Sequence, residues 1–432
     1  MMKFRLVFIS FIMLASMCLI VACSSNESGD NGESSGQGDE VVVDLFNIKV
    51  ETTDQLNNLI DIYESENENV KINVTTVGGG QDAPSALQAK FSSGEAPSIF
   101  LLGGLSDVEK YSEYLLDVSD MESAKTAIDG TLEGASMNGT PYGIPLNIEG
   151  YGWMINKDIF ERAGVDPSTI DSYDKFVEAV ETIDSQKEEL GIDSVFAFSA
   201  KEDWVVSQFS SHFTAPEFGN DVKTAFESEE LNFEYGERMK EYTDLFNNYN
   251  YQPILSLDYS TSVEELFAND RAAIIHQGNW IVPTLNSMDE SFAQEKLGIL
   301  PLFVSSDTEG KLVAGPSWYW GINKEKDEAV VEESKKFIDW MYTSDKGKEL
   351  IVEDFKYVPS HEGYDTDSIS DPVSAEVYQY LLDGKGKIWA NNQYPDGFFS
   401  EALHPEFQKY LGEQQSWEEF KEATSNAFSE MR

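Results

Sequence analysis

VVVDLFNIKV at residues 41–50, VKINVT at 70–75 and SIFLL at 98–102 are three short segments rich in apolar and β-branched side chains. The first is almost continuously apolar and predicts a buried strand. In the second, apolar and polar residues alternate, which predicts a strand with one face buried. The third predicts another buried strand, so three strands are expected within the first 62 residues of this region.

The segments between these strands have helical periodicity. Thr53 or Asp54 can cap a helix whose apolar residues recur on one face, and a second helix is expected to begin at Pro84. Strand, helix, strand, helix, strand is the order typical of a mostly parallel sheet with helices on both faces, so the predicted fold class is α/β. Further helices are predicted over residues 172–183, 263–269, 328–342 and 417–431.

Composition excludes several functions. The chain has 432 residues, of which 41% are hydrophobic, so it can bury an ordinary core and form two or three lobes. It carries 30 Lys and Arg against 78 Asp and Glu, a net charge of −48. Such a chain is repelled by phosphate backbones, and we therefore expect no nucleic-acid partner.

The N-terminal segment resembles a bacterial lipoprotein signal. An apolar run over residues 6–21 is too short for a spanning helix and is typical of a signal peptide. It ends in small residues before Cys23, which resembles a lipobox, so we expect residues 1–22 to be removed and Cys23 to be lipidated. The alternative is an ordinary secretory signal with a chance cysteine. Residues 23–40 are mostly Ser, Gly, Asn and acidic, which predicts a flexible tether.

Motifs for nucleotide, metal or nucleophilic chemistry are weak. The glycine triplet at 78–80 completes no GxGxxG pattern, and no Gly-Lys pair is followed by Ser or Thr as in a P-loop. The four histidines form no HExxH motif, and both cysteines lie within the first 23 residues. We therefore expect no metal or redox cofactor. Because acidic residues are abundant, the carboxylate pair of a glycoside hydrolase stays open.

Tryptophans are the most informative residues. Several of the eight stand beside Gly, Pro, Asn or Gln, as in QGNW, PSWYWG and IWANNQ. An indole in such a loop suits a sugar, whose C–H face stacks on the ring while amides and carboxylates bind its hydroxyls. Burial of each ring at the edge of a core is the alternative. The tryptophans in question are Trp153, Trp204, Trp280, Trp318, Trp320 and Trp389.

An ordered set of motifs resembles one known family. The motifs are YGIP (142–145), GWMINKDIF (152–160), FSSGEAP (91–97), AAI to GNW (272–280), LGI to Pro301 (297–301), the helix 328–342 with TS (343–344), and VP (358–359). Together they resemble extracellular solute-binding proteins of family 1, the maltose-binding-protein-like sugar receptors of ABC importers. Phe303 departs from the family pattern, which has a second proline there.

The resemblance implies a two-lobed periplasmic-binding-protein-like fold of type II, with the ligand in a cleft between lobes. Lobe one is then expected over 41–148 plus 318–380 and lobe two over 152–313 plus 390–432. The chain is expected to cross between lobes near 148–152, 314–318 and 383–390. Hinge closure around the ligand follows from such an arrangement.

The resemblance also implies the ligand-binding residues. Trp280 is the strongest candidate, at a position where family members stack an aromatic ring on sugar. Glu149 is expected to accept hydrogen bonds from hydroxyls at the first crossing. The remaining candidates lie near the other crossings, at strand ends of lobe one, or, for Trp204, in lobe two: Trp318, Tyr319, Trp389, Tyr394, Gln81, Asp82, Asp107 and Trp204.

The expected function is therefore that of a lipid-anchored binding protein on the outer side of the membrane. The protein is expected to be a monomer that captures a carbohydrate, an oligosaccharide, and delivers it to permease subunits served by a separate ATPase. Two alternatives are a secreted glycoside hydrolase and a sugar sensor without a transport role. The family pattern implies neither catalytic residues nor a cofactor.

Overall fold

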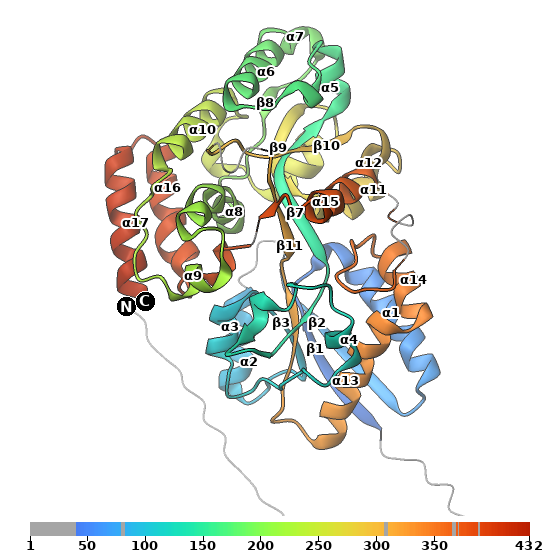
Figure 1. Ribbon diagram of the computed structural model, residues 1–432. Coiled ribbons are helices and arrows are strands. Elements are labelled where there is room, and N and C mark those ends of the chain that lie inside the picture. Colours follow the sequence, from blue (N-terminus) through green and yellow to red (C-terminus); the bar gives the residue numbers. More distant parts are fainter. Residues whose placement is uncertain (1–39, 79–82, 306–309, 365–368, 370, 388) are drawn as a thin grey trace, which may run out of the picture. The chain divides into compact units, whose positions relative to one another are not determined.

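The computed structural model describes residues 40–78, 83–305, 310–364, 369, 371–387 and 389–432, which belong to one compact unit built around two sheets (Figure 1). The first sheet has the strand order β2-β1-β3-β12-β6. Strand β1 is parallel to β2 and β3, whereas β12 is antiparallel to β3 and β6. The strands are β1 (Val41–Asn47), β2 (Val70–Thr76), β3 (Ile99–Leu102), β6 (Ile144–Pro145) and β12 (Tyr319–Ile322).

The second sheet corrects the prediction of a mostly parallel arrangement. Its order is β13-β11-β7-β9-β8, with β10 also paired to β7. The central strand β7 is antiparallel to β9, β10 and β11, and only the β8–β9 and β11–β13 pairs are parallel. The strands are β7 (Ile148–Asn156), β8 (Ser194–Phe196), β9 (Ala272–Gly278), β10 (Leu297–Leu300), β11 (Leu312–Pro316) and β13 (Gly386–Lys387); β4 (Ser136–Met137) and β5 (Thr140–Pro141) form a separate hairpin.

Helices cover both faces of the first sheet. One face packs on α1 (Thr53–Glu66), α13 (Glu328–Thr343) and α14 (Asp345–Glu353), and the other on α2 (Ala83–Ser93) and α3 (Leu105–Lys110). The predicted cap of α1 is wrong by one residue. Thr52 occupies the N-cap position without a capping bond, because its hydroxyl lies 2.9 Å from the Tyr357 hydroxyl instead.

Around the second sheet the predicted helices are largely confirmed. The segment 172–183 is α6 (Tyr173–Ser185), whose N-cap Ser172 accepts from the Lys175 backbone N–H. The segment 263–269 falls in a π-helical turn, Ser260–Phe267, rather than an α-helix. The remaining helices are α4 (Glu122–Lys125), α5 (Lys157–Arg162), α7 (Lys187–Leu190), α8 (Asp203–Thr214), α9 (Val222–Glu227), α10 (Gly236–Tyr249), α11 (Val282–Met288), α12 (Phe292–Glu295), α15 (Pro372–Leu382), α16 (His404–Leu411) and α17 (Trp417–Met431).

The chain connects the two sheets more than once. It leaves the first sheet after β6, enters the second at β7, and returns between β11 and β12. Helix α15 contacts β7, β10 and β11 through Val373 and Val377, so it accompanies the second sheet although residues 318–380 were expected in lobe one.

Three of the six singled-out tryptophans, Trp153, Trp320 and Trp389, are buried in hydrophobic clusters. Trp153 is fully buried under the second sheet, and Trp320 is buried in the core of the first. Trp153 and Trp320 both stand on strands, where alternate side chains point into the core. A neighbouring glycine on such a strand therefore does not indicate an exposed loop. Among the described residues, no helix is long and apolar enough to cross a membrane.

Candidate functional site

The first residues of β7 form the centre of the junction between the sheets. Strand β11 pairs Gly315 with Glu149 and Val313 with Tyr151, and β9 pairs Gly278 with Tyr151. A side chain at Gly278 would come within 2.2 Å of the Trp280 ring, so glycine is required for this ring to lie over the strand end. The tight packing fixes where Trp280 lies relative to β7.

Four aromatic rings meet beside this strand end. We call Tyr151, Trp204, Trp280 and Trp389 the aromatic cluster. Trp280 is the central indole, with ring centroids 6.0 Å from Trp389 and 6.3 Å from Trp204, and Tyr151 lies 4.7 Å from Trp389. Tyr151 and Trp389 are buried, whereas Trp204 and Trp280 are half-buried. The fold thus brings together three predicted site residues: Trp204 from α8, Trp280 from the turn after β9 and Trp389 from the segment after β13.

The orientation of Trp280 is fixed by a hydrogen bond. Its indole Nε1 donates to Gln277 Oε1 over 2.9 Å. The polar edge of the ring is therefore engaged by the protein, which leaves its face as the part suited to stacking.

Glu149 lies at this junction, and the protein already engages its carboxylate. Lys49 Nζ is 2.7 Å from Glu149 Oε1 and 2.8 Å from a carboxylate oxygen of Glu51, and Ser317 Oγ donates to Glu149 Oε2 over 2.6 Å. Burial disfavours the charged form of Lys49, but the adjacent Glu149 and Glu51 outweigh it and raise the pKa of the lysine above its ordinary value. Glu149 therefore anchors the junction electrostatically.

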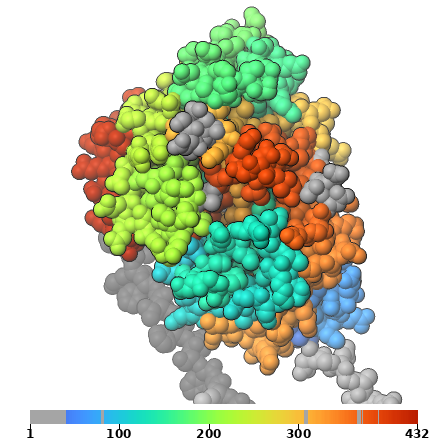
Figure 2. Space-filling model, in the orientation of Figure 1, coloured from blue at the N-terminus to red at the C-terminus, as the bar shows by residue number. Residues whose placement is uncertain are grey.

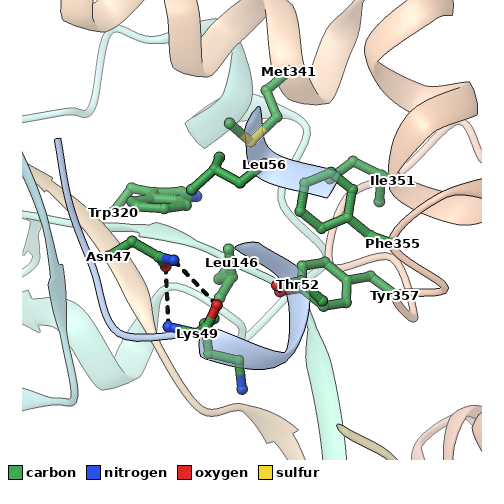
Figure 3. A pocket seen from close by; sticks show the side chains of 10 residues that line it. All are labelled: Asn47, Lys49, Thr52, Leu56, Leu146, Trp320, Met341, Ile351, Phe355 and Tyr357. Carbon is green, nitrogen blue, oxygen red and sulfur yellow. Dashed lines mark hydrogen bonds between the residues drawn. The ribbon is translucent and has the colours of Figure 1, made fainter. Parts of the chain in front are cut away.

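Lys49 borders a small cavity in the first core, shown in Figure 3. The Asn47 side chain bonds both the N–H and the carbonyl of Lys49, at 3.0 and 3.1 Å. The Lys49 ammonium points away from Trp320 and Leu56 on the far side of the cavity. The cavity measures about 10 Å³, which is room for no more than one water molecule, so it is not a site for a sugar.

Trp318 and Asp107 lie on the first-sheet side of the junction. A side chain built at Gly103 would be 3.4 Å from the Trp318 ring and 3.3 Å from Asp107 Oδ2, so both converge on this glycine. Asp107 Oδ2 accepts from the Gly103 N–H at 2.7 Å, and burial raises the pKa of its carboxyl. Asn392, which sequence reasoning missed, donates from its amide to the Ser317 carbonyl at 2.9 Å.

Helix α3 is tied to the segment that follows Trp389. The Leu105 N–H donates to Gln393 Oε1 at 2.8 Å, and Ser106 Oγ donates to the Tyr394 carbonyl at 2.9 Å. Gln393 was not predicted as a contact, although it stands in the amide-rich stretch 391–393 that follows a singled-out tryptophan.

The other predicted residues lie elsewhere. Tyr319 is buried in the core between the first sheet and α3, and the Tyr394 ring is buried among phenylalanines with its hydroxyl 2.7 Å from Thr214. Neither side chain belongs to the aromatic cluster. Gln81, Asp82 and Cys23 lie outside the described residues.

A larger hollow lies on the second sheet away from this junction. It measures about 770 Å³ and is bordered by Lys157, Asp166 and Glu376 among others. In Figure 2 the green residues of α5 and its following turn lie above the orange-red residues of α15, and both border this hollow. Burial raises the pKa of Glu376 there. This hollow is not lined by any of the predicted site residues that the structure describes.

Buried polar side chains that sequence reasoning did not single out lie next to the aromatic cluster. His212 Nε2 is 3.2 Å from His276 Nε2, and the Tyr151 hydroxyl bonds Ser211. Each histidine stands alone in the sequence, so only the fold brings this pair together. Among the described residues, no group of three or more His, Cys, Asp or Glu is arranged to hold a metal ion.

Comparison with known proteins places these features in a family. The family described as bacterial extracellular solute-binding protein matches residues 58–377. The multiple sugar-binding protein of Streptococcus mutans is 23% identical over 294 residues, which are 63% of this chain and 64% of that protein. The xylose/arabinose-binding protein XacG of Haloferax volcanii is 24% identical over 243 residues, 54% of this chain and 52% of that protein. The chain thus spans less than two thirds of either curated relative.

The solved structure of a chitin oligosaccharide binding protein superposes with a TM-score of 0.76 at 20% identity, covering 91% of this chain and 99% of that one. The predicted fold is confirmed: this is the α/β fold of two-domain periplasmic sugar-binding proteins. Because the family match extends over 320 of the 432 residues, the chain belongs to the bacterial extracellular solute-binding family.

Proposed function

We propose that this chain is the substrate-binding component of an ABC transporter, which captures a carbohydrate outside the membrane and delivers it to a permease. The observation that supports this most is the convergence of Trp204, Trp280 and Trp389 from three separate segments. The three similar proteins named above are all described as binding sugars.

The sugar would stack on the half-buried faces of Trp204 and Trp280. An indole face packs well against the C–H face of a pyranose, and amides nearby can bind its hydroxyls. Trp318 and Asp107, from the first-sheet side, would contact the same ligand. An oligosaccharide fits a site with several aromatic rings better than a single sugar unit does.

Closure of two lobes would hold the ligand. Lobe one would be built on the first sheet and lobe two on the second, with the hinge in the segments that join β6 to β7 and β11 to β12. A ligand favours the closed state only if it touches both lobes there. The Lys49–Glu149 ion pair stands next to the proposed hinge and would hold its strands in register.

We further propose that the protein binds its sugar without chemical change. Glu149, a carboxylate at the centre of the junction, is engaged by Lys49 and Ser317. The measurement is the release of reducing ends from the bound sugar, which should stay at the level of a protein-free control. Release above that level would favour the alternative function, a glycoside hydrolase.

The location follows the family, whose members are extracellular. We propose that Cys23 is lipidated and that residues 24–40 tether a monomeric globule to the membrane, since two acyl chains anchor stably where one is marginal. Incorporation of labelled palmitate in cells should be seen for the wild type and lost in Cys23→Ser. Equal labelling of both would reject the anchor.

Trp280→Ala tests the sugar site. A thermal-shift screen of sugars identifies a ligand, which at 100 times its dissociation constant adds about 2.7 kcal/mol to stability. Calorimetry should then show Trp280→Ala binding about 5- to 150-fold more weakly, a loss of about 1–3 kcal/mol.

Trp340→Ala is the matched control, because Trp340 is also half-buried but lies on α13, where its Nε1 donates to Glu66. This variant should bind as the wild type does. Unchanged sugar binding by Trp280→Ala would show that Trp280 is not part of the site. If no sugar in the thermal-shift screen stabilises the protein, the proposed carbohydrate function is rejected.

A further inference from the structure

A concentration of unpaired polar atoms adjoins the aromatic cluster. We call His212, His276 and Lys387, together with Gln208 and Asn391, the polar layer. Each is at least nine-tenths buried, and each has a side-chain atom without a hydrogen-bond partner among the described residues. Buried polar groups are nearly always paired. Five such groups from four segments therefore point to recognition of something polar.

The polar layer is continuous with the aromatic cluster. Lys387 on β13 pairs with Val313 on β11, which pairs in turn with Tyr151 on β7. Directly paired residues project to the same face of a sheet, so these three side chains share one face. The Tyr151 ring packs 5.0 Å from His212 and 4.7 Å from Trp389.

Lys387 is the charged member of this layer. It is 4% exposed, and its Nζ has no hydrogen-bond partner among the described side chains. Burial, reinforced by the positive charge of Lys311, lowers the pKa of Lys387 to about 8. Lys49 is buried to a similar degree but lies against two carboxylates. The contrast identifies Lys387 as a buried cation without a counter-ion among the described residues.

The neighbours of Lys387 are neutral. Burial, with contributions from His276 and Lys387, holds the pKa of His212 well below its ordinary value, and burial lowers that of His276 to about 3. Both imidazoles are therefore uncharged at neutral pH and can bind hydroxyls, as can the amides of Gln208 and Asn391. The layer offers one positive charge surrounded by neutral hydrogen-bonding groups.

We propose that Lys387 binds a carboxylate of the ligand, and that the carbohydrate is therefore an acidic one containing a hexuronic acid. This rests on the proposed function and names the substrate class of that same site. One ammonium matches the single charge of a carboxylate, whereas a phosphate carries nearly two charges and calls for more donors. The neutral amides and imidazoles would bind the hydroxyls of the same sugar unit.

The test uses matched acidic and neutral sugars. Calorimetry compares cellobiouronic acid with cellobiose, and digalacturonic acid with its neutral counterpart digalactose, in the wild type, Lys387→Met and Lys385→Met. Methionine retains the length of lysine without its charge. Lys385 is the control, because it lies two residues away and is half exposed in an ion pair with Asp383.

The wild type and Lys385→Met should bind the acidic member of at least one pair about tenfold or more tightly than its neutral partner. Lys387→Met should lose this preference while still binding the neutral sugar, which shows that the variant is folded. Circular dichroism melting of each variant provides a second check on folding.

Three results would overturn the proposal. Neutral sugars bound as well as acidic ones would reject the acidic substrate and leave the sugar-binding function standing. An acid preference that survives in Lys387→Met would reject Lys387 as its cause. Absence of binding to every member of both pairs would reject the acidic substrate, and the wider sugar screen then decides separately whether the carbohydrate function fails too.

Discussion

Two buried tryptophans show how the two cores differ. In the first core, Trp320 Nε1 donates to the Tyr342 hydroxyl at 2.9 Å, and that hydroxyl donates to the Leu146 carbonyl at 2.8 Å. In the second, Trp153 is fully buried 5.3 Å from the His276 ring, and its Nε1 has no partner among the described residues. The same side chain is paired in one core and unpaired in the other.

The difference extends to the charges. The buried cation at the edge of the first core, Lys49, lies against Glu149 and Glu51, while Lys387 on β13 of the second sheet has no such partner in the described part of the chain. Buried groups that are fully paired hold an architecture together, whereas unpaired ones cost stability and are tolerated where function uses them. On the proposals above, the first region supports the fold and the second recognises the ligand.

The largest effect should follow from breaking the paired region. Lys49→Met leaves the buried Glu149 carboxylate without its cation, which should lower the free energy of unfolding by about 3–5 kcal/mol. Urea denaturation measures this loss of stability. Lys71→Met is the control, because Lys71 pairs with Glu64 at the surface, where an ion pair contributes little. If both variants lose the same small amount, Lys49 does not support the fold.

A smaller effect of opposite sign is expected in the unpaired region. Lys387→Met removes a buried, unpaired charge and should raise the free energy of unfolding by about 1–3 kcal/mol at pH 7 without ligand. In the wild type the folded lysine releases its proton near pH 8, but the unfolded one near 10.5. Wild-type stability therefore rises between these values, and the advantage of the variant should shrink there.

Urea denaturation of both proteins at pH 7 and at about pH 10 checks this sign. A variant less stable than the wild type at pH 7 would mean that Lys387 is compensated, and the contrast with Lys49 would then disappear.

Local pattern predicted much of this molecule. The periodicity of 328–342 and 417–431 gave α13 and α17 almost to the residue, since each has an apolar face and clear ends. The antiparallel second sheet could not be predicted in this way. Strand β7 pairs with β9 and β11, whose residues are more than a hundred positions away, and local periodicity does not report the direction of such partners.

The site was predictable only in part for the same reason. Trp280 and Trp153 both follow glycine-containing stretches, QGNW and GYGW, and only the fold makes one half-exposed and the other buried. His212 and Lys387 carry no local signal, because an isolated histidine or lysine in a sequence is indistinguishable from a surface residue. Their meeting beside β7 depends on the strand order.

The smallest effect compares one histidine from each region. Burial lowers the pKa values of His276, beside the second sheet, and His361, beside the first, to about 3. Unfolded histidine takes up a proton near pH 6.5, so each should cost about 1.4 kcal/mol of stability per pH unit as the pH falls below that value. His361 Nδ1 is 3.0 Å from Ser360 Oγ and its ring stacks on Tyr342, although its Nε2, like His276 Nδ1, has no hydrogen-bond partner among the described residues.

Asparagine at either position removes one of these titrations. Urea denaturation between pH 6.5 and about pH 5 should therefore show His276→Asn and His361→Asn each with a pH slope shallower than that of the wild type by about 1.4 kcal/mol per unit. Both rings are already neutral in the folded protein over this range, so bound sugar should leave both slopes unchanged. A variant that keeps the wild-type slope would mean that its histidine is already protonated in the folded protein, so that burial does not hold that ring neutral.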